Sequence, residues 1–378
     1  MECLLEWKCC VVKKQSIFLH FLLVLCVFLL VICIFESKQI LPFGSRLEST
    51  QYPIDRTKQI QKMLETGYCE LGPGDFYITG LEMPEGSTLS GMGLSTRLIL
   101  LEKAEDVSAI SLSSCCTVRD LQLLGSLEEP ELSEKTAGRH GILFKGNASK
   151  QAGSPELCQV ENCLIRNFTG GGITCTNTGY AIRASMNVTD CTILNCGAGI
   201  NISYFSEYHQ FSGVGVQNCY YGCVNNGGNN MFTNCSFSGN SIGFLIDNSR
   251  GQSRNNSHGS AVGCTFNHSG NNEGVGIRIL GASYGFVFSG CQLFYAATEI
   301  ENSRGIVFDG CNFGEKEVIR VDGGEMVMFS DCLFRSPPAL SVTNNDAVMF
   351  ADCFTHNGDV FGNDAQQKQD SDPENTHE

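Results

Sequence analysis

The chain has 378 residues, of which 42 are glycine and 21 are cysteine, and it carries a formal net charge of −15. The few basic residues of its repeat region form no run or stripe, which argues against a nucleic-acid partner, because neutralising phosphates requires clustered Lys and Arg. The same acidic balance repels a polyuronate unless a cation such as Ca²⁺ bridges the two.

The amino-terminal part predicts a membrane anchor. Residues 17–35 are almost unbroken hydrocarbon, interrupted by His20, and their 19 positions approach the roughly 20 that cross a bilayer. Three lysines precede this span, which favours a cytosolic amino terminus and an extracytoplasmic bulk of the chain at the cell surface. We therefore interpret residues 1–35 as cytosolic tail and anchor, and 36–54 as a tether. The alternative is a cleaved signal peptide and a secreted protein, but residues 36–42 offer no small-residue cleavage site.

Short strands follow one amphipathic helix. The helix is predicted over Thr57–Glu65, with Ile60, Met63 and Leu64 on one face. Runs of β-favouring residues bounded by Gly, Pro and Asp then predict strands at Phe76–Thr79, Ser87–Ser90, Arg97–Leu101, Ala109–Leu112 and Val118–Leu123. Residues 126–139 are a charged insertion, regular coils run from Gly141 to about Val360, and the polar tail 362–378 is predicted to be disordered.

One sequence motif recurs along the chain: apolar residues are followed by polar ones and then by a cysteine, as in Val307–Phe313. Its cysteines are Cys163, Cys191, Cys219, Cys235, Cys264, Cys291, Cys311, Cys332 and Cys353. Successive spacings are 28, 28, 16, 29, 27, 20, 21 and 21 residues, which is typical of a solenoid. Equivalent positions in a solenoid stack about 4.8 Å apart, so we expect these nine cysteines to form a buried ladder rather than disulfides. The 16-residue step from Cys219 to Cys235 indicates a slip in register.

Six cysteines outside this motif are the better candidates for disulfide bonds in an exported chain. They are Cys115, Cys116, Cys158, Cys175, Cys196 and Cys223. The chain has no paired CxxC framework, so no structural zinc site is expected.

The opening coils carry a family resemblance. Leu71–Gly80 with Met83–Gly93, and later Asn162–Ile173, resemble coils of the pectate-lyase-like superfamily. The resemblance covers roughly residues 50–360 and implies an all-β fold, a single-stranded right-handed parallel β-helix over residues 55–361 with a capping helix. That superfamily contains lyases, glycosidases, epimerases, tailspikes and non-catalytic adhesins, so the resemblance does not imply one activity.

The catalytic motifs of the superfamily are incomplete. Ser257–Gly259 and Arg278–Leu280 are similar to the Gly-His-Gly and Arg-Ile-Lys of polygalacturonase-like members, but the chain contains no Asp-Asp pair and ends the second motif in leucine. Arg335–Leu340 begins like the Arg-x-Pro-x-x-Arg strand of pectate lyases but lacks its final arginine. Whether the protein is a lyase, hydrolase, epimerase or no enzyme therefore stays open.

Polar and titratable residues concentrate between Tyr204 and Glu273, and coils of this length would place them in one strip along a flank. The catalytic candidates are Asp247, Arg250 and His258, because carboxylate, guanidinium and imidazole groups can transfer protons or recognise a carboxylate. The substrate-binding candidates are Tyr204, Glu207, His209, Asn229, Asn230, Arg254, His268, Glu273 and Arg278. No metal ligands are assigned, and no cofactor is required.

The resulting hypothesis is a membrane-anchored, outward-facing β-helix that binds a polysaccharide or surface glycan, with cleavage or epimerisation of that glycan left open. The alternative is a non-catalytic surface or adhesion module, in which the strip consists of ordinary polar turns.

Overall fold

The structure is a computed structural model. It describes residues 46–47, 54–101, 107–134, 136–145, 156–176, 184–204, 206–249, 258–268, 274–314, 318–335, 339–343 and 348–361. The predicted span 17–35 and the tail 362–378 lie outside these ranges, as does nearly all of the tether. Within the described ranges, no helix is long and apolar enough to cross a membrane. Residues up to Arg46, with the start of β1 (Arg46–Leu47), belong to a separate compact unit, and the account below concerns the unit from Leu47 onward.

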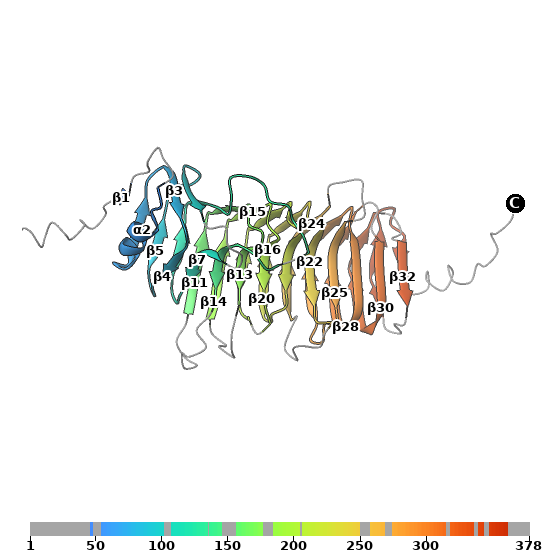
Figure 1. The fold of residues 1–378 in the computed structure, drawn as a ribbon. Coiled ribbons are helices and arrows are strands. Elements are labelled where there is room, and N and C mark those ends of the chain that lie inside the picture. Colours follow the sequence, from blue (N-terminus) through green and yellow to red (C-terminus); the bar gives the residue numbers. More distant parts are fainter. Residues whose placement is uncertain are drawn as a thin grey trace, which may run out of the picture. The chain divides into compact units, whose positions relative to one another are not determined.

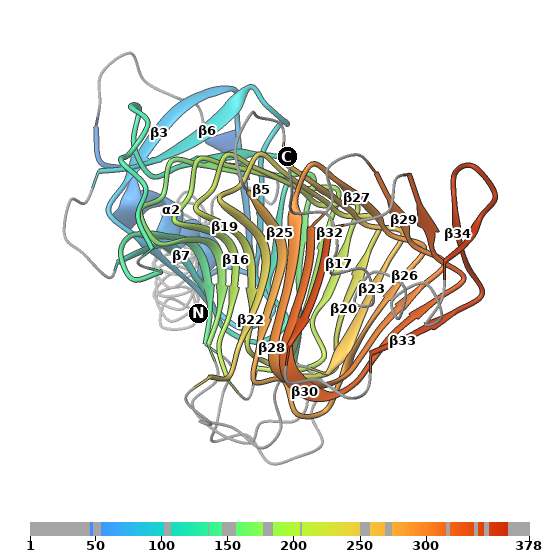
Figure 2. The ribbon, with the colours of Figure 1, turned by 90° about the vertical axis from the view of Figure 1, so that its right-hand side faces the viewer.

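From Tyr68 onward the chain winds through three ladders of parallel strands, one strand of each ladder in every coil (Figure 1 and Figure 2). The first ladder contains β4 (Leu81–Met83), β7 (Ser108–Leu112), β10 (His140–Phe144), β13 (Gly171–Cys175), β16 (Ala198–Ile202), β19 (Tyr221–Asn225), β22 (Ile242–Asp247), β25 (Val275–Leu280) and β32 (Ala339–Thr343). The second contains β2 (Tyr68–Leu71), β5 (Thr88–Ser90), β8 (Thr117–Arg119), β11 (Glu156–Glu161), β14 (Ala184–Thr189), β17 (Gln210–Ser212), β20 (Asn230–Thr233), β23 (Gly259–Val262), β26 (Phe286–Ser289) and β33 (Val348–Ala351).

The third ladder forms a sheet of its own. It contains β3 (Gly74–Ile78), β6 (Thr96–Leu100), β9 (Gln122–Leu124), β12 (Leu164–Arg166), β15 (Thr192–Leu194), β18 (Gly215–Gln217), β21 (Ser236–Ser238), β24 (Thr265–Asn267), β27 (Gln292–Phe294), β29 (Asn312–Phe313), β31 (Leu333–Phe334) and β34 (Cys353–Thr355), which pairs antiparallel with β35 (Val360–Phe361). The parallel β-helix predicted from the repeats is thus confirmed.

Two late strands join the first and second ladders. β28 (Ala297–Asp309) and β30 (Val318–Ser330) have 13 residues each and run through the corner between the ladders without a break. The positive φ angles of Asn302 (45°) and Gly305 (68°) allow β28 to bend there. Because the two ladders share these strands, they form one continuous sheet.

The predicted cap and the early strands are largely confirmed. Helix α2 (Thr57–Leu64) buries Ile60, Met63 and Leu64 against the first coil. The single strand predicted over Val118–Leu123 is wrong, because Asp120 has a φ of 57° and divides the segment into β8 and β9, which belong to different ladders.

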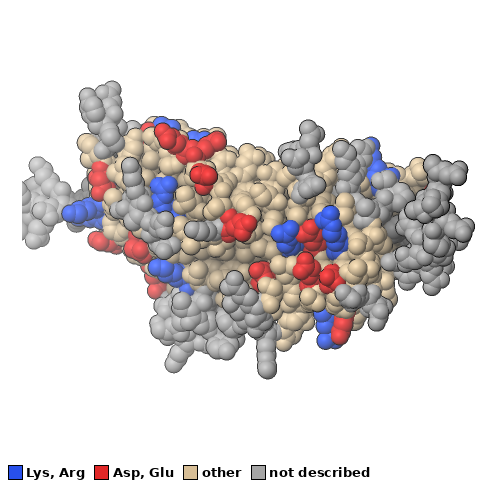
Figure 3. Space-filling model, turned by 45° about the vertical axis from the view of Figure 1, so that its right-hand side comes forward, with Lys and Arg blue, Asp and Glu red and all other residues tan. Residues whose placement is uncertain are grey.

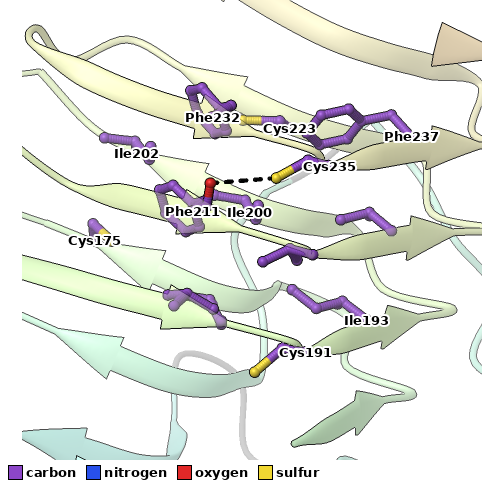
Figure 4. Close-up of a cluster of buried hydrophobic side chains, with 14 of the residues drawn as sticks. Cys175, Cys191, Ile193, Ile200, Ile202, Phe211, Cys223, Phe232, Cys235 and Phe237 are labelled. Carbon is purple, nitrogen blue, oxygen red and sulfur yellow. Dashed lines mark hydrogen bonds between the residues drawn. The ribbon is translucent and has the colours of Figure 1, made fainter. Parts of the chain in front are cut away.

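The cysteine ladder contains eight of the nine predicted cysteines, seven placed directly before a third-ladder strand and Cys353 as the first residue of β34. Cys219 is the exception: it follows β18, and Val214 occupies the ladder position before that strand. The 16-residue step from Cys219 to Cys235 therefore does not mark an irregular coil. It arose because the repeated motif was aligned on Cys219, in the corner after β18, instead of on Val214. Figure 4 shows the ladder members Cys191 and Cys235 pointing into the core, where the Cys235 thiol donates to the Phe211 carbonyl oxygen at 3.5 Å.

None of the sixteen described cysteines is in a disulfide bond, so the pairing predicted for the cysteines outside the ladder is not present in this structure. Cys175, Cys196 and Cys223 are fully buried and belong to the apolar core. In a core of this kind a thiol behaves as a small apolar side chain with a weak donor.

We expect the ladder thiols to resist alkylation in the native protein. The hydrogen bond with Cys291 lowers the pKa of the Cys311 thiol, but the hydrogen bond with Cys332 and burial raise it, and the resulting pKa is about 12. The reactive thiolate is therefore scarce at neutral pH as well as inaccessible. Mass spectrometry after native alkylation should find Cys264, Cys311 and Cys332 unmodified and the exposed Cys115 modified. Rapid native labelling of the ladder would contradict its buried position.

Candidate functional site

The corner between the first and second ladders carries five of the predicted site residues. Tyr204 and Asp247 lie where first-ladder strands end, while Glu207, Asn229 and His258 lie shortly before second-ladder strands begin. Since successive coils stack at this corner, the structure brings these five residues into two neighbouring rows.

The first row is held by hydrogen bonds between coils. The Tyr204 hydroxyl donates to the backbone carbonyl oxygen of Asp247 at 3.0 Å, and the Asp247 N–H donates to Asn226 Oδ1 at 2.9 Å. Asp247 Oδ1 accepts hydrogen bonds from the N–H and the hydroxyl of Ser249, at 2.9 and 2.6 Å. One carboxylate oxygen of Asp247 therefore stabilises its own turn.

The second row is half-buried, as the first is. Asn229 Nδ2 donates to Glu207 Oε2 at 3.2 Å. The His258 ring lies 5.8 Å from the Tyr284 ring, which is 60% exposed. His258 also lies against Gly228, where an added Cβ would approach its Cε1 to 2.3 Å, so a side chain at position 228 would displace the imidazole.

His209 and Asn230 lie inside the same corner and are fully buried, so they are not available to a ligand in solution. The Met186 N–H donates to His209 Nδ1 at 3.1 Å, which makes Nδ1 an acceptor and places the proton on Nε2. His209 Nε2 is 2.8 Å from the hydroxyl oxygen of Ser206, to which it then donates. This Ser–His pair is in the wrong protonation state for activating a nucleophile, because the base must accept from the hydroxyl.

Burial lowers the pKa of His209 to about 3, which keeps the ring neutral. Asn230 accepts from the His209 N–H at 3.0 Å and donates to Asn225 Oδ1 at 2.8 Å. The two predicted ligand-binding residues therefore satisfy buried backbone and side-chain groups at the corner.

The other predicted residues lie elsewhere or outside the described ranges. His268 follows β24, at the corner between the third and first ladders, and its Nδ1 is 3.1 Å from the Asn240 carbonyl oxygen. The structure does not bring it to the corner that holds Asp247. Arg250, Arg254 and Glu273 are not among the described residues.

Arg278 lies on the outer surface of the first ladder and begins a row of alternating charge. It pairs in register with Glu299, which pairs with Arg320 in the next coil. Arg278 Nε donates to Glu299 Oε2 at 2.7 Å, and Arg320 Nη1 donates to Glu299 Oε1 at 2.8 Å. Both oxygens of the Glu299 carboxylate are thus engaged by arginines from neighbouring coils.

An acidic row lies two positions further along the same strands. Asp247, Leu280, Glu301 and Asp322 occupy successive coils in register. The Thr343 hydroxyl donates to Asp322 Oδ1 at 2.8 Å. Residues two apart in a strand point to the same side, so both rows share one surface. Figure 3 shows basic and acidic side chains gathered side by side on an otherwise mostly uncharged surface. We call Asp247, Arg278, Glu299, Glu301, Arg320 and Asp322 the charged face.

Tyrosines and an external apolar cluster border the charged face. Ala198, Val224, Ile242, Leu245 and Val275 form a cluster on the first ladder, separate from the core, and Tyr221 packs against it. Burial raises the pKa of Tyr221, and Arg278 is close enough to lower it in part. Glu134 of the charged insertion is hydrogen-bonded to Tyr220. Aromatic and apolar groups beside charged hydrogen-bonding groups are suited to binding sugars, which have apolar faces and polar edges.

Among the described residues, no group of three or more His, Cys, Asp or Glu side chains is arranged to hold a metal ion.

Comparisons with known proteins support the fold alone. No protein-family profile and no curated protein matches the sequence. The enzymatically active domain of tailspike protein 2 from bacteriophage CBA120 is 14% identical, with a TM-score of 0.54, over 80% of this chain and 52% of that domain. A GH87 α-1,3-glucanase from Streptomyces thermodiastaticus is 14% identical, with a TM-score of 0.57, over 82% and 70% of the two chains. The amino-terminal fragment of gene product 12 from bacteriophage Phi29 is 12% identical, with a TM-score of 0.56, over 87% and 68%.

The chain thus has the fold of a right-handed parallel β-helix. It spans about half of the tailspike domain that it matches, at 52% of that length.

Proposed function

We propose that the protein binds a polysaccharide along the charged face. The observation that carries the proposal is the pairing of two rows, one of alternating arginine and glutamate and one acidic, that continue from coil to coil beside tyrosines. Side chains on rigid strands hold their positions better than side chains on loops, which favours ordered recognition of an extended ligand. A glucanase and an enzymatically active tailspike domain with the same fold add support.

Two candidate activities follow from the acidic row. Glu301 and Asp322 lie one strand apart, about 4.8 Å, and Asp247 lies two strands from Glu301, about 9.6 Å. Glycosidases that retain configuration separate their carboxyl groups by about 5 Å, and inverting enzymes by about 6.5–9.5 Å. Hydrolysis is therefore compatible with the row. Non-catalytic binding is favoured by Glu299, whose carboxylate is neutralised by two arginines.

The cellular setting belongs to the same proposal. The apolar span 17–35 would anchor the protein, with the β-helix on the extracytoplasmic side. A polyuronate ligand would require Ca²⁺ to offset the net charge of −15.

A glycan panel with the full chain in detergent tests the proposal, with reducing ends and unsaturated products measured in parallel. Asp247→Asn and Arg320→Ala should each weaken binding by about 1.5–3 kcal/mol, the value of a charged hydrogen bond to ligand. Arg320 is the better arginine to remove, because it is 55% exposed and Glu299 keeps Arg278 as a partner. Glu301→Gln and Asp322→Asn should abolish turnover and leave binding largely intact if the acidic row is catalytic.

Asp309→Asn and Asp331→Asn are matched controls outside the charged face, and His258→Ala tests the corner separately. Equal losses in the controls and in the charged-face variants, on a glycan that the parent binds, would place the site elsewhere.

A further inference from the structure

Three cysteines gather at the corner that leads into the second ladder, away from the charged face. Cys115 and Cys116 directly precede β8, and Cys158 lies in β11 of the next coil. Gln159 pairs with Thr117, and the Gln159 N–H donates to the Cys116 carbonyl oxygen at 2.8 Å. This register makes Cys116 and Cys158 neighbours on adjacent strands.

The two neighbouring thiols are both fully buried. Each donates to a backbone carbonyl oxygen of the same corner, Cys116 to that of Pro84 at 3.2 Å and Cys158 to that of Ser113 at 2.9 Å. Adjacent parallel strands are about 4.8 Å apart, within the roughly 4.4–6.8 Å that a disulfide needs between Cα atoms. Cys116 directly follows a residue with a φ of 58°, so its backbone turns at a corner and is not held in the middle of a strand.

The pair differs from the cysteine ladder in two ways. Cys115 is the one exposed cysteine among those described, and it is the chain neighbour of Cys116. The hydrogen bond from Cys158 lowers the pKa of Cys116 to about 7, against the raising effect of burial, and that bond also raises the pKa of Cys158. Cys116 therefore has a larger share of thiolate, the nucleophilic form, at neutral pH than a thiol with an unshifted pKa. Most ladder cysteines, such as Cys311, instead have a raised pKa, and Cys353, whose pKa is lowered, has no exposed cysteine beside it.

We propose that Cys116 and Cys158 form a disulfide bond that links two neighbouring coils, with Cys115 as the entry point for the oxidant. The oxidant is a disulfide of low molecular weight. The Cys115 thiolate attacks it, forms a mixed disulfide and releases one small thiolate. Cys116 then attacks the Cys115 sulfur and releases the second small thiolate.

In the last step Cys158 attacks the Cys116 sulfur, and Cys115 leaves as a thiolate. Two electrons and two protons pass from the Cys116–Cys158 pair to the external disulfide, which becomes two thiols, and Cys115 is restored. Each step is an exchange between a thiolate and a disulfide, so no metal or flavin is needed.

The test uses the reduced full chain in detergent with oxidised glutathione as the probe. Samples are alkylated over time and digested, and cross-linked peptides are identified by mass spectrometry. We expect a Cys116–Cys158 peptide and the loss of two alkylatable thiols in the denatured protein. Cys115→Ser should give the same product about tenfold more slowly, because the accessible thiol is gone.

Two variants act as controls. Cys158→Ser should prevent the cross-link and still fold, because a hydroxyl can donate to the Ser113 carbonyl oxygen as the Cys158 thiol does at 2.9 Å. Cys332→Ser, in the ladder, should leave the cross-link unchanged.

The absence of a Cys116–Cys158 peptide, or equally fast cross-linking of ladder neighbours such as Cys311 and Cys332, would overturn the proposal. An unchanged rate in Cys115→Ser would remove the entry role of that residue. Glycan binding is measured separately, so failure here leaves the proposed function untouched.

Discussion

Replacing Cys311 by aspartate is expected to lower the free energy of unfolding by several kcal/mol, because it leaves an unpaired charge in the core. Cys311 is 1% exposed, and its thiol donates to the Phe288 carbonyl oxygen at 3.3 Å. A carboxylate at this position has no proton to donate and would face that carbonyl oxygen. Cys311→Val should cost less than about 1.5 kcal/mol, since it stays apolar and nearly keeps the volume.

Urea unfolding followed by circular dichroism measures both variants. Tryptophan fluorescence is unsuitable, because the only tryptophan is Trp7, outside the coils. Asp331→Asn, at an exposed turn beside the ladder, controls for a nearby change of charge. A loss for Cys311→Val as large as that for Cys311→Asp would show that volume, and not charge, limits the ladder.

Acidification is expected to destabilise the corner that contains His209. Burial lowers its pKa from 6.5 to about 3 in the folded protein. The unfolded chain therefore binds more protons between these values, and stability is present above pH 6.5 and lost as the pH falls towards 3. The slope is about 1.4 kcal/mol for each pH unit, which gives an upper bound of about 5 kcal/mol over the whole interval.

His209→Gln removes this titration and keeps a side chain that can accept from the Met186 N–H. We expect the variant to be less stable than the parent at pH 7 but to lose less stability between pH 7 and pH 4, as measured by urea unfolding at each pH. His356→Gln, at an exposed turn, should follow the parent. Parallel pH dependence of the parent and His209→Gln would assign the acid sensitivity to other groups.

The repeat made most of the fold predictable, because a buried position in a solenoid returns once per coil. The error at Cys219 shows the limit of this signal. The core requires a small apolar residue before β18, and Val214 meets that requirement as well as a cysteine does. A search for cysteines therefore skipped the true position and accepted one in the following corner.

The candidate site was harder to predict than the fold, because the polarity of a corner residue does not tell whether its side chain is buried inside the corner or lies on the surface. His209 and Asn230 are polar since buried backbone groups at the corner need partners. Glu299 and Arg320 were missed because they lie outside the window enriched in polar residues. Their signal was the spacing of 21 residues from Arg278 to Glu299 and from Glu299 to Arg320, which equals the late cysteine spacing.

For the polysaccharide ligand that we propose, the register of the charged face limits the length over which side chains and sugar units stay aligned. Its side chains recur at the strand spacing of about 4.8 Å, which the backbone hydrogen bonds fix. A polymer whose units repeat about 0.5 Å further apart would be displaced by about 2 Å after four coils, and its groups would no longer face the same side chains. The affinity for an oligomer should therefore rise steeply with its length only over the first few units. Longer chains should gain further affinity only because they can slide between equivalent positions on the charged face.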